Sequence, residues 1–103
     1  MLTNANMTNH AVCRMQQRGM TKSTLSFVLE HADRDKFVGA GCRENWISRK
    51  HLKRLRQDGM PSQLVERSAG IAIIVADDGA IITVFHKTER TRNKKYKQHP
   101  IIH

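Results

Sequence analysis

The sequence contains few cysteines, few aromatic residues and no long hydrophobic run. Cys13 and Cys42 are its only cysteines and show no Cys-x-x-Cys spacing, so a disulfide framework is excluded and both are expected to be reduced thiols. Aromatic residues make up 5% of the 103 positions, so the core has to rest on Ile, Val, Leu and Met. No apolar run approaches the roughly 18 residues of a membrane span, and the opening residues do not resemble a secretory signal. We therefore expect a cytoplasmic protein with no membrane contact.

Acidic residues are scarce as well, with nine Asp and Glu against 18 Lys and Arg, which gives a formal net charge of +9. Such an excess implies a polyanionic partner, with nucleic acid ahead of an acidic membrane surface or an acidic protein. A chain of this length is typical of one domain that buries about 65% of its unfolded surface, which is enough for one core.

The strongest structural pattern is a hairpin near the end of the chain. Two apolar runs flank Asp77-Asp78-Gly79, and Asp-Gly between such runs is typical of a tight primed turn. The run at 71–76 is apolar on both faces, which favours a strand in the middle of a sheet. Alternate positions of the following strand, at 80–85 and on to His86, are expected on opposite faces: Ile82, Val84 and His86 on one, and Ile81, Thr83 and Phe85 on the other.

Capping residues and helical spacing predict the remaining elements. We expect helices from Thr8 or Asn9 to about Arg18, from Thr21 to about Ala32, from 49 to about 57 after Ser48, and a short one after Pro61 that ends before Gly70. Two further strands are expected at 36–40 and 44–47, joined by a turn at Gly39-Ala40-Gly41. Adjacent helices and adjacent strands, without strict alternation, favour an α+β class with an antiparallel sheet. The pattern predicts one domain over residues 8–90 and a basic, mobile tail over 91–103.

The third expected helix is the most basic part of this domain, with five cations within eight residues. Such a density indicates phosphate contacts, although an ordinary solvated helix face has the same composition. The candidate nucleic-acid-binding residues are Arg49, Lys50, Lys53, Arg54 and Arg56 on that helix, with Lys87 and Arg90 after the last strand. Trp46 either stacks on a base or belongs to the core beside Ile47.

Cleavage of RNA without a metal needs a base, an acid and cations that hold the phosphate. His10, Arg14 and Arg18 recur every four residues, so they line one strip of the first helix and are candidates for the base and the phosphate clamp. His86, where the last strand ends, is a second candidate base. A solvated basic helix face and a strand that runs out into a charged tail are the simpler alternatives, and both stay open.

Metal and thiol chemistry are not expected. The six histidines show no metal-ligand spacing, and no Asp or Glu pair is placed for acid–base work. We therefore predict no metal site and no cofactor. Cys13 falls among helix core positions, which predicts a buried and unreactive thiol.

The opening motif is similar to that of a known family. His10-Ala11, followed by Arg14-Met15-Gln16-Gln17-Arg18-Gly19-Met20, resembles the typical start of the small bacterial family catalogued as domain of unknown function 4258, His-Ala-x-x-Arg-Met-x-x-Arg-Gly-Ile. That family ends on a hairpin that closes on Ile-Thr-Val with a polar residue after it, and here the corresponding residues are Ile82-Thr83-Val84-Phe85-His86-Lys87. The resemblance covers most of residues 8–90. The family looks like a distant relative of the RelE/ParE toxin-like fold, grouped with barnase-like and colicin-type ribonucleases.

The resemblance implies two N-terminal helices packed on a small curved antiparallel sheet, a RelE-like arrangement. Here a basic helical segment at 49–66 stands where many members have a strand and a short loop. The resemblance further implies a metal-independent, toxin-like endoribonuclease that uses His10, Arg14 and Arg18 with polar groups of the last strands, and an acidic antitoxin or inhibitor as partner. Several RelE-type toxins have a tyrosine after the last strand, whereas Tyr96 lies in the tail. An endoribonuclease, a non-catalytic RNA-binding or regulatory module, and a protein-interaction role remain open.

Overall fold

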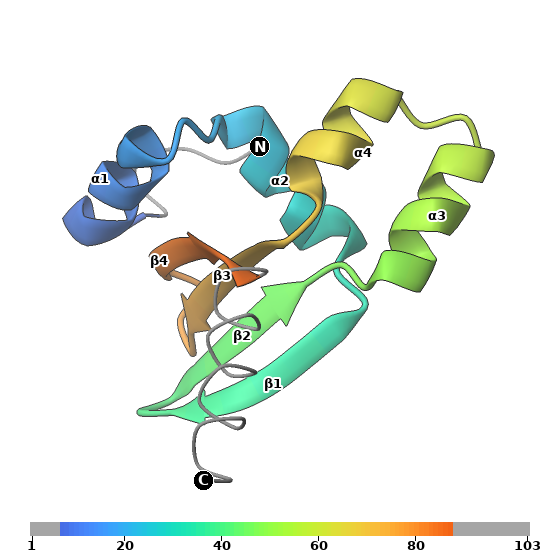
Figure 1. Ribbon diagram of the computed structural model, residues 1–103. Helices are drawn as coiled ribbons and strands as arrows, with labels where there is room; N and C mark the ends of the chain where they lie inside the picture. Colours follow the sequence, from blue (N-terminus) through green and yellow to red (C-terminus); the bar gives the residue numbers. More distant parts are fainter. Residues whose placement is uncertain (1–6, 88–103) are drawn as a thin grey trace, which may run out of the picture.

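The computed structural model describes residues 7–87. Four helices and four strands follow one another along the chain (Figure 1): α1 Asn9–Gln17, α2 Lys22–His31, β1 Arg34–Gly39, β2 Cys42–Trp46, α3 Arg49–Gln57, α4 Ser62–Ser68, β3 Ile71–Ala76 and β4 Ile81–His86. The strands form one antiparallel sheet in the order β1-β2-β3-β4. The predicted α+β class with an antiparallel sheet is therefore confirmed.

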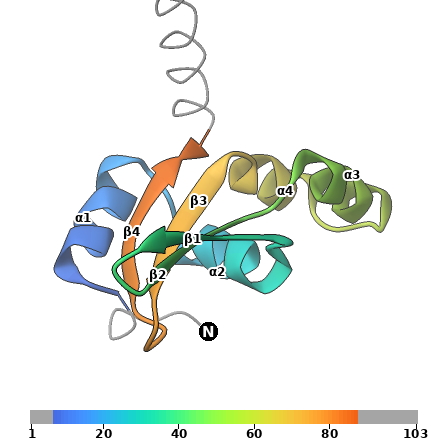
Figure 2. The same cartoon turned by 90° about the horizontal axis from the view of Figure 1, so that it is seen from below.

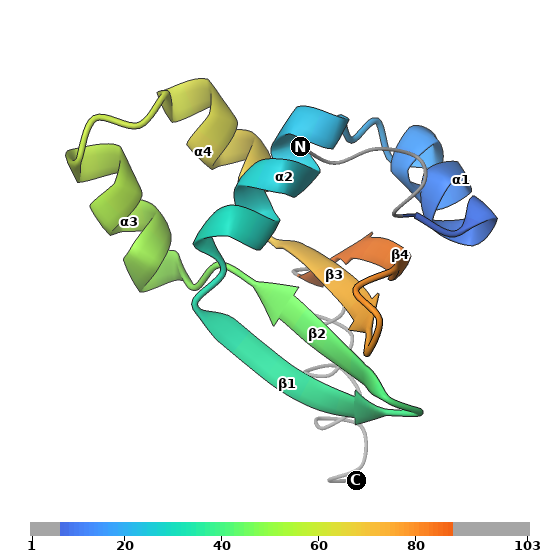
Figure 3. The same ribbon diagram turned by 180° about the vertical axis from the view of Figure 1, so that it is seen from behind.

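The helices gather on one side of the sheet (Figures 1 and 3). Helix α1 packs against β4, α2 packs on β2 and β3, and α4 packs on both α2 and α3. The basic segment between β2 and β3 thus adds α3 and α4 to the layer formed by the first two helices. Among the described residues, no helix has the length and apolar character needed to cross a membrane.

Three of the helices begin at the hydroxyl residues that the sequence indicates. The side-chain oxygens of Thr8, Thr21 and Ser48 accept hydrogen bonds from backbone N–H groups three residues further on, at 3.1, 3.2 and 3.2 Å. Each bond satisfies one N–H group that has no partner inside its helix. Helix α4 starts one residue after Pro61, which stands at the cap position without a side-chain hydrogen bond.

Helices α1 and α3 end in the same way, at a glycine followed by a methionine. The N–H group of Met20 donates to the carbonyl of Met15 at 2.9 Å, and that of Met60 donates to the carbonyl of Leu55 at 3.1 Å. This six-to-one bond closes the last turn when the intervening residue is left-handed, as Gly19 is at φ +66°. The two helix ends that the sequence predicts from glycine are confirmed.

The hairpin of β3 and β4 is antiparallel as predicted, but its turn differs from the prediction. The N–H group of Gly79 donates to the carbonyl of Ala76, and the N–H group of Ala76 donates to the carbonyl of Ala80, each at 2.9 Å. Within the loop only Gly79 has a positive φ, at +89°. A primed turn needs its first central residue in that region, so the predicted turn type is wrong. The loop is a three-residue connection in which glycine takes the left-handed position.

The predicted faces of β4 are also wrong in part, because the ladder between β3 and β4 shifts register. Ile73 lies opposite Val84, whereas Val75 lies opposite Ile81 after a shift between Ile74 and Val75. One extra residue in β4 therefore turns Ile81 and Val84 to the same face, and both are 1% exposed. Strict alternation assigned these two residues to opposite faces.

The core lies between the helices and the sheet, and β3 occupies the middle of the sheet as its two apolar faces predict. Helix α1 contributes Ala11 and Met15, which are buried, and Val12, which packs against them in part, as expected. Cys13 was expected in the core but is exposed. At about 100° per residue it lies some 200° around the helix from Ala11, so it faces solvent when Ala11 and Met15 face β4.

The outer edge of β4 is covered by residues from the start of the described chain. Met7 forms a bridge to Ile81, and the Thr8 N–H group donates to the carbonyl of Ile81 at 3.0 Å. The Thr8 hydroxyl donates to the carbonyl of Ile82 at 2.9 Å, across 74 positions of sequence. Thr8 therefore caps α1 and fixes α1 beside β4 at the same time.

A second polar link fixes the start of α3 to the turn between α2 and β1. One carboxylate oxygen of Asp33 accepts from the Ser48 N–H group at 2.7 Å, and the other accepts from the Ser48 hydroxyl at 2.6 Å. Partial burial raises the pKa of Asp33. The hydrogen bonds from Ser48 and the nearby His51 outweigh this effect, so the pKa of Asp33 lies below its ordinary value.

Replacement of Asp33 by Asn should therefore destabilise the fold in a pH-dependent way. A folded-state pKa below the unfolded value, about 3.9, stabilises the protein above that pH, and the stabilisation disappears as the pH falls through the folded-state pKa. In urea unfolding, Asp33→Asn should lower the midpoint near neutral pH, and the difference from wild type should shrink below about pH 4. Glu30→Gln, an exposed carboxylate on α2, is the control and should change little. A deficit of the same size at every pH would contradict the electrostatic origin.

Candidate functional site

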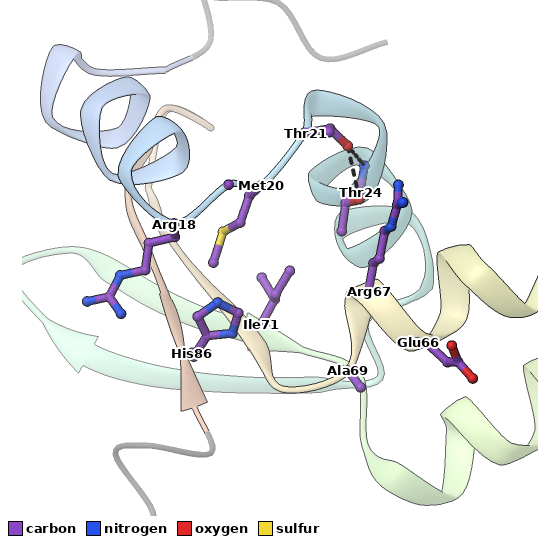
Figure 4. Close-up of a pocket in the computed structure, with 10 residues that line it drawn as sticks. Arg18, Met20, Thr21, Thr24, Glu66, Arg67, Ala69, Ile71 and His86 are labelled. Carbon is purple, nitrogen blue, oxygen red and sulfur yellow. Dashed lines mark hydrogen bonds between the residues drawn. The ribbon is translucent and has the colours of Figure 1, made fainter.

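A hollow of about 620 Å³ opens beside the end of β4 (Figure 4). Three helices meet there with the sheet: the end of α1, the start of α2 and the end of α4. The side chains on its wall are of four kinds, basic, hydroxylic, apolar and acidic: Arg18, Arg67 and His86; Thr21 and Thr24; Met20 and Ile71; and Glu66. The carboxylate of Glu66 points away from the centre in Figure 4.

Sheet pairing brings Arg18 and His86 to the same place. His86 is the last residue of β4 and lies opposite Ile71, the first residue of β3. Arg18 follows α1, which packs along β4, so the end of the helix reaches the end of the strand. In Figure 4 the imidazole ring of His86 lies between Arg18 and Ile71. Two of the four predicted catalytic residues therefore line one hollow.

The other wall of the hollow comes from α2 and α4. The hydroxyl groups of Thr21 and Thr24 lie 3.0 Å apart, and Thr24 is buried. Arg67 is exposed on α4 and stands beside Thr24 in Figure 4. Sequence patterns did not identify these three residues as site residues, and nothing in the local sequence indicates that Arg67 would line the same hollow as the end of β4. Guanidinium groups around a hollow favour an anionic ligand such as a phosphate.

The three residues of the predicted strip on α1, His10, Arg14 and Arg18, do not all line the hollow. His10 is exposed in the first turn of α1, about 12 Å along the helix axis from Arg18. Arg14 is partly buried, and neither His10 nor Arg14 lines the hollow. Of the two candidate bases, His86 is therefore the one that lies in the hollow, beside Arg18. Within residues 7–87, no three His, Cys, Asp or Glu side chains are grouped in a way that holds a metal ion.

The five predicted cations of α3 form a second basic region, which we call the α3 face. All five are exposed, whereas Leu52 and Leu55 on the opposite side of the helix are buried. None of the five makes an ion pair with another described residue. Helix α3 lies at the far end of the helical layer from α1 (Figures 2 and 3), so the α3 face is separate from the hollow.

Lys87 is already paired inside the protein. Its Nζ lies 2.6 Å from a carboxylate oxygen of Glu44, which is 1% exposed, and 3.9 Å from the centre of the Trp46 ring. Its charge is therefore largely compensated, which weakens its predicted role as a phosphate contact. Trp46 is partly exposed and serves as the ring under this ammonium group. Arg90 and the predicted tail lie outside the described residues.

Replacement of Lys87 should lower the free energy of unfolding, because it removes the ion pair with Glu44. Lys87→Met leaves a buried carboxylate without its ammonium partner, and we expect a loss of about 1.5–3 kcal/mol by urea unfolding. Arg56→Met, which removes an exposed cation of the α3 face, is the matched control and should cost less than about 0.5 kcal/mol. Combination of Lys87→Met with Glu44→Gln should cost less than the sum of the single changes. Additive losses would mean that the two side chains do not stabilise each other.

A scan against protein-family models, a search of the curated proteins and a search of the solved structures gave no match to this chain. The family resemblance of the sequence motifs therefore stays a prediction.

Proposed function

We propose that this protein binds single-stranded RNA. The observation that carries the proposal is the α3 face, where five exposed cations stand in two turns of one helix with no described acidic partner. Cations that stability does not require are available to phosphates, and their release of counterions drives binding. The net charge of +9 supports the same partner.

The α3 face extends along the helix. Its cations span residues 49–56, about 10 Å along the helix axis, so the face can contact more than one phosphate of a strand. The hollow is the reason to prefer a single strand over a duplex. Its volume lies within the ~300–1,000 Å³ of pockets that hold small ligands, and a single strand offers unstacked nucleotides that a duplex does not.

Binding should weaken steeply with salt. If about five phosphates are neutralised, the logarithm of the affinity for a single strand should fall against that of the salt concentration with a slope near −3.5. Replacement of Lys50, Lys53 and Arg54 by Ala should flatten the slope by roughly two units in a fluorescence titration. Replacement of Lys22, Arg34 and Lys36, three cations on other elements, is the charge-matched control and should change it by less. An affinity that ignores salt would refute the proposal.

A second candidate function, RNA cleavage without a metal, is favoured by one observation, the position of His86 beside Arg18 in the hollow. In such a reaction a base takes the proton of the ribose 2′-hydroxyl, and the oxygen attacks the adjacent phosphorus. The 5′-oxygen then leaves and takes a proton from solvent water, and a 2′,3′-cyclic phosphate remains. His86 is the candidate base, and Arg18 and Arg67 are the groups that would stabilise charge on the phosphate.

An assay with purified protein, RNA and EDTA separates binding from cleavage. His86→Ala should reduce cleavage at least ~10²-fold and leave binding nearly unchanged, because a neutral imidazole attracts phosphate weakly. His10→Ala, the matched control on α1, should retain cleavage because it lies outside the hollow. The products should carry 2′,3′-cyclic phosphates, and DNA should remain uncut. Equal cleavage by all three proteins would indicate another nuclease in the sample, and binding without any cleavage would leave RNA binding as the whole function.

A further inference from the structure

The hollow has an apolar floor, which a site for phosphate alone does not need. Met20 and Ile71 line it and are themselves 8% and 1% exposed, so they belong to the core and are held in place by it. Met20 is fixed further by its backbone hydrogen bond to Met15 at the end of α1. A rigid apolar floor beneath polar walls is the usual composition of a pocket that receives an organic ring.

The two arginines stand on different walls of this hollow. Arg18 comes from the end of α1 and Arg67 from α4, and in Figure 4 their guanidinium groups point in different directions away from Met20 and Ile71, with the ring of His86 on the Arg18 side. Such an arrangement does not converge on one phosphate. It suits two phosphates, one on each side of whatever occupies the floor.

We propose that the hollow holds one unstacked nucleotide of single-stranded RNA, with its base on Met20 and Ile71 and its two flanking phosphates on Arg18 and Arg67. This inference rests on the proposed RNA binding and deepens it. The first turn of α2 lines the same wall as Arg67, and the positive end of that helix favours a phosphate there. The ring of His86 lies beside Arg18 in the same hollow, so it is near the phosphate assigned to Arg18.

The proposal makes Arg67 a binding residue that is distinct in role from Arg18. A nucleoside carrying phosphates at both its 3′ and 5′ positions reproduces the expected ligand without the rest of the strand. In calorimetric titrations at low salt, adenosine 3′,5′-bisphosphate should bind at least about tenfold more tightly than adenosine 3′- or 5′-monophosphate. Its counterpart without a base should bind about tenfold more weakly, as expected for the loss of roughly 50 Å² of buried apolar contact.

Two single variants test the assignment of the phosphates. Arg18→Gln should bind the bisphosphate no better than one of the two monophosphates, and Arg67→Gln no better than the other. Both residues are exposed, and the urea unfolding midpoint of each variant is measured to show that it is folded in the titrations. Arg56→Gln on the α3 face is the matched control: it should leave all nucleotide affinities unchanged and flatten only the salt dependence of RNA binding.

Three outcomes would overturn the inference. Loss of the same phosphate preference in both variants would mean that the arginines share one phosphate. Equal affinity for the bisphosphate with and without its base would mean that the floor receives no base. No nucleotide binding by wild type, with the salt-dependent RNA binding of the α3 face intact, would remove the hollow as a site while RNA binding stood. Absence of RNA binding altogether would instead refute the proposed function.

Discussion

The burial of β3 is the constraint on which the rest of the structure depends. Its side chains are apolar on both faces, so the strand needs neighbours along both edges and a helical layer over one face, and its first three residues are buried. β2 and β4 occupy the edges, and α2 packs over Ile71 and Ile73 on one side. The hollow follows from this arrangement. Because β4 pairs along the whole of β3, its last residue, His86, comes back to Ile71, where the chain enters the sheet from α4.

Rules that concern a few neighbouring residues predicted the local structure well. Hydroxyl caps and glycine ends placed α1, α2 and α3, because the hydrogen bonds that start and stop a helix span three to five residues. The same rules failed where a strand or a turn contains one extra residue that no sequence pattern indicates. The register shift between Ile74 and Val75 is such a case, and it moved Ile81 to the face opposite to the one predicted. The loop at Gly79 is another, because Asp-Gly suits both a two-residue and a three-residue connection.

Only those parts of the candidate site that lie on a single helix or strand could be predicted from the sequence. The cations of the α3 face follow from the composition of one helix, and the structure leaves them exposed. The hollow is lined by residues from three helices and the sheet. The spacing of residues in the sequence therefore did not indicate that Arg18 and Arg67 line one hollow, or that His10 lies outside it.

The prediction for Lys87 failed for a different reason. In the sequence Lys87 is one more basic residue before a basic tail, but in the structure the carboxylate of Glu44, far away in the sequence, compensates its charge. A high net charge therefore overstates the number of cations that a polyanion can use.

The bonds from Thr8 to the last strand also determine the order in which the chain can assemble. They join residues 74 positions apart, so a ribosome that adds about 5–20 residues per second makes α1 some 4–15 s before it makes Ile82. An isolated helix of nine residues is not stable in water, and the main packing partner of α1 is β4. The first helix to be synthesised is therefore among the last to dock. Closure of the longest loop in the domain, and with it the protection of the β4 edge, waits until nearly the whole of the described chain has been made.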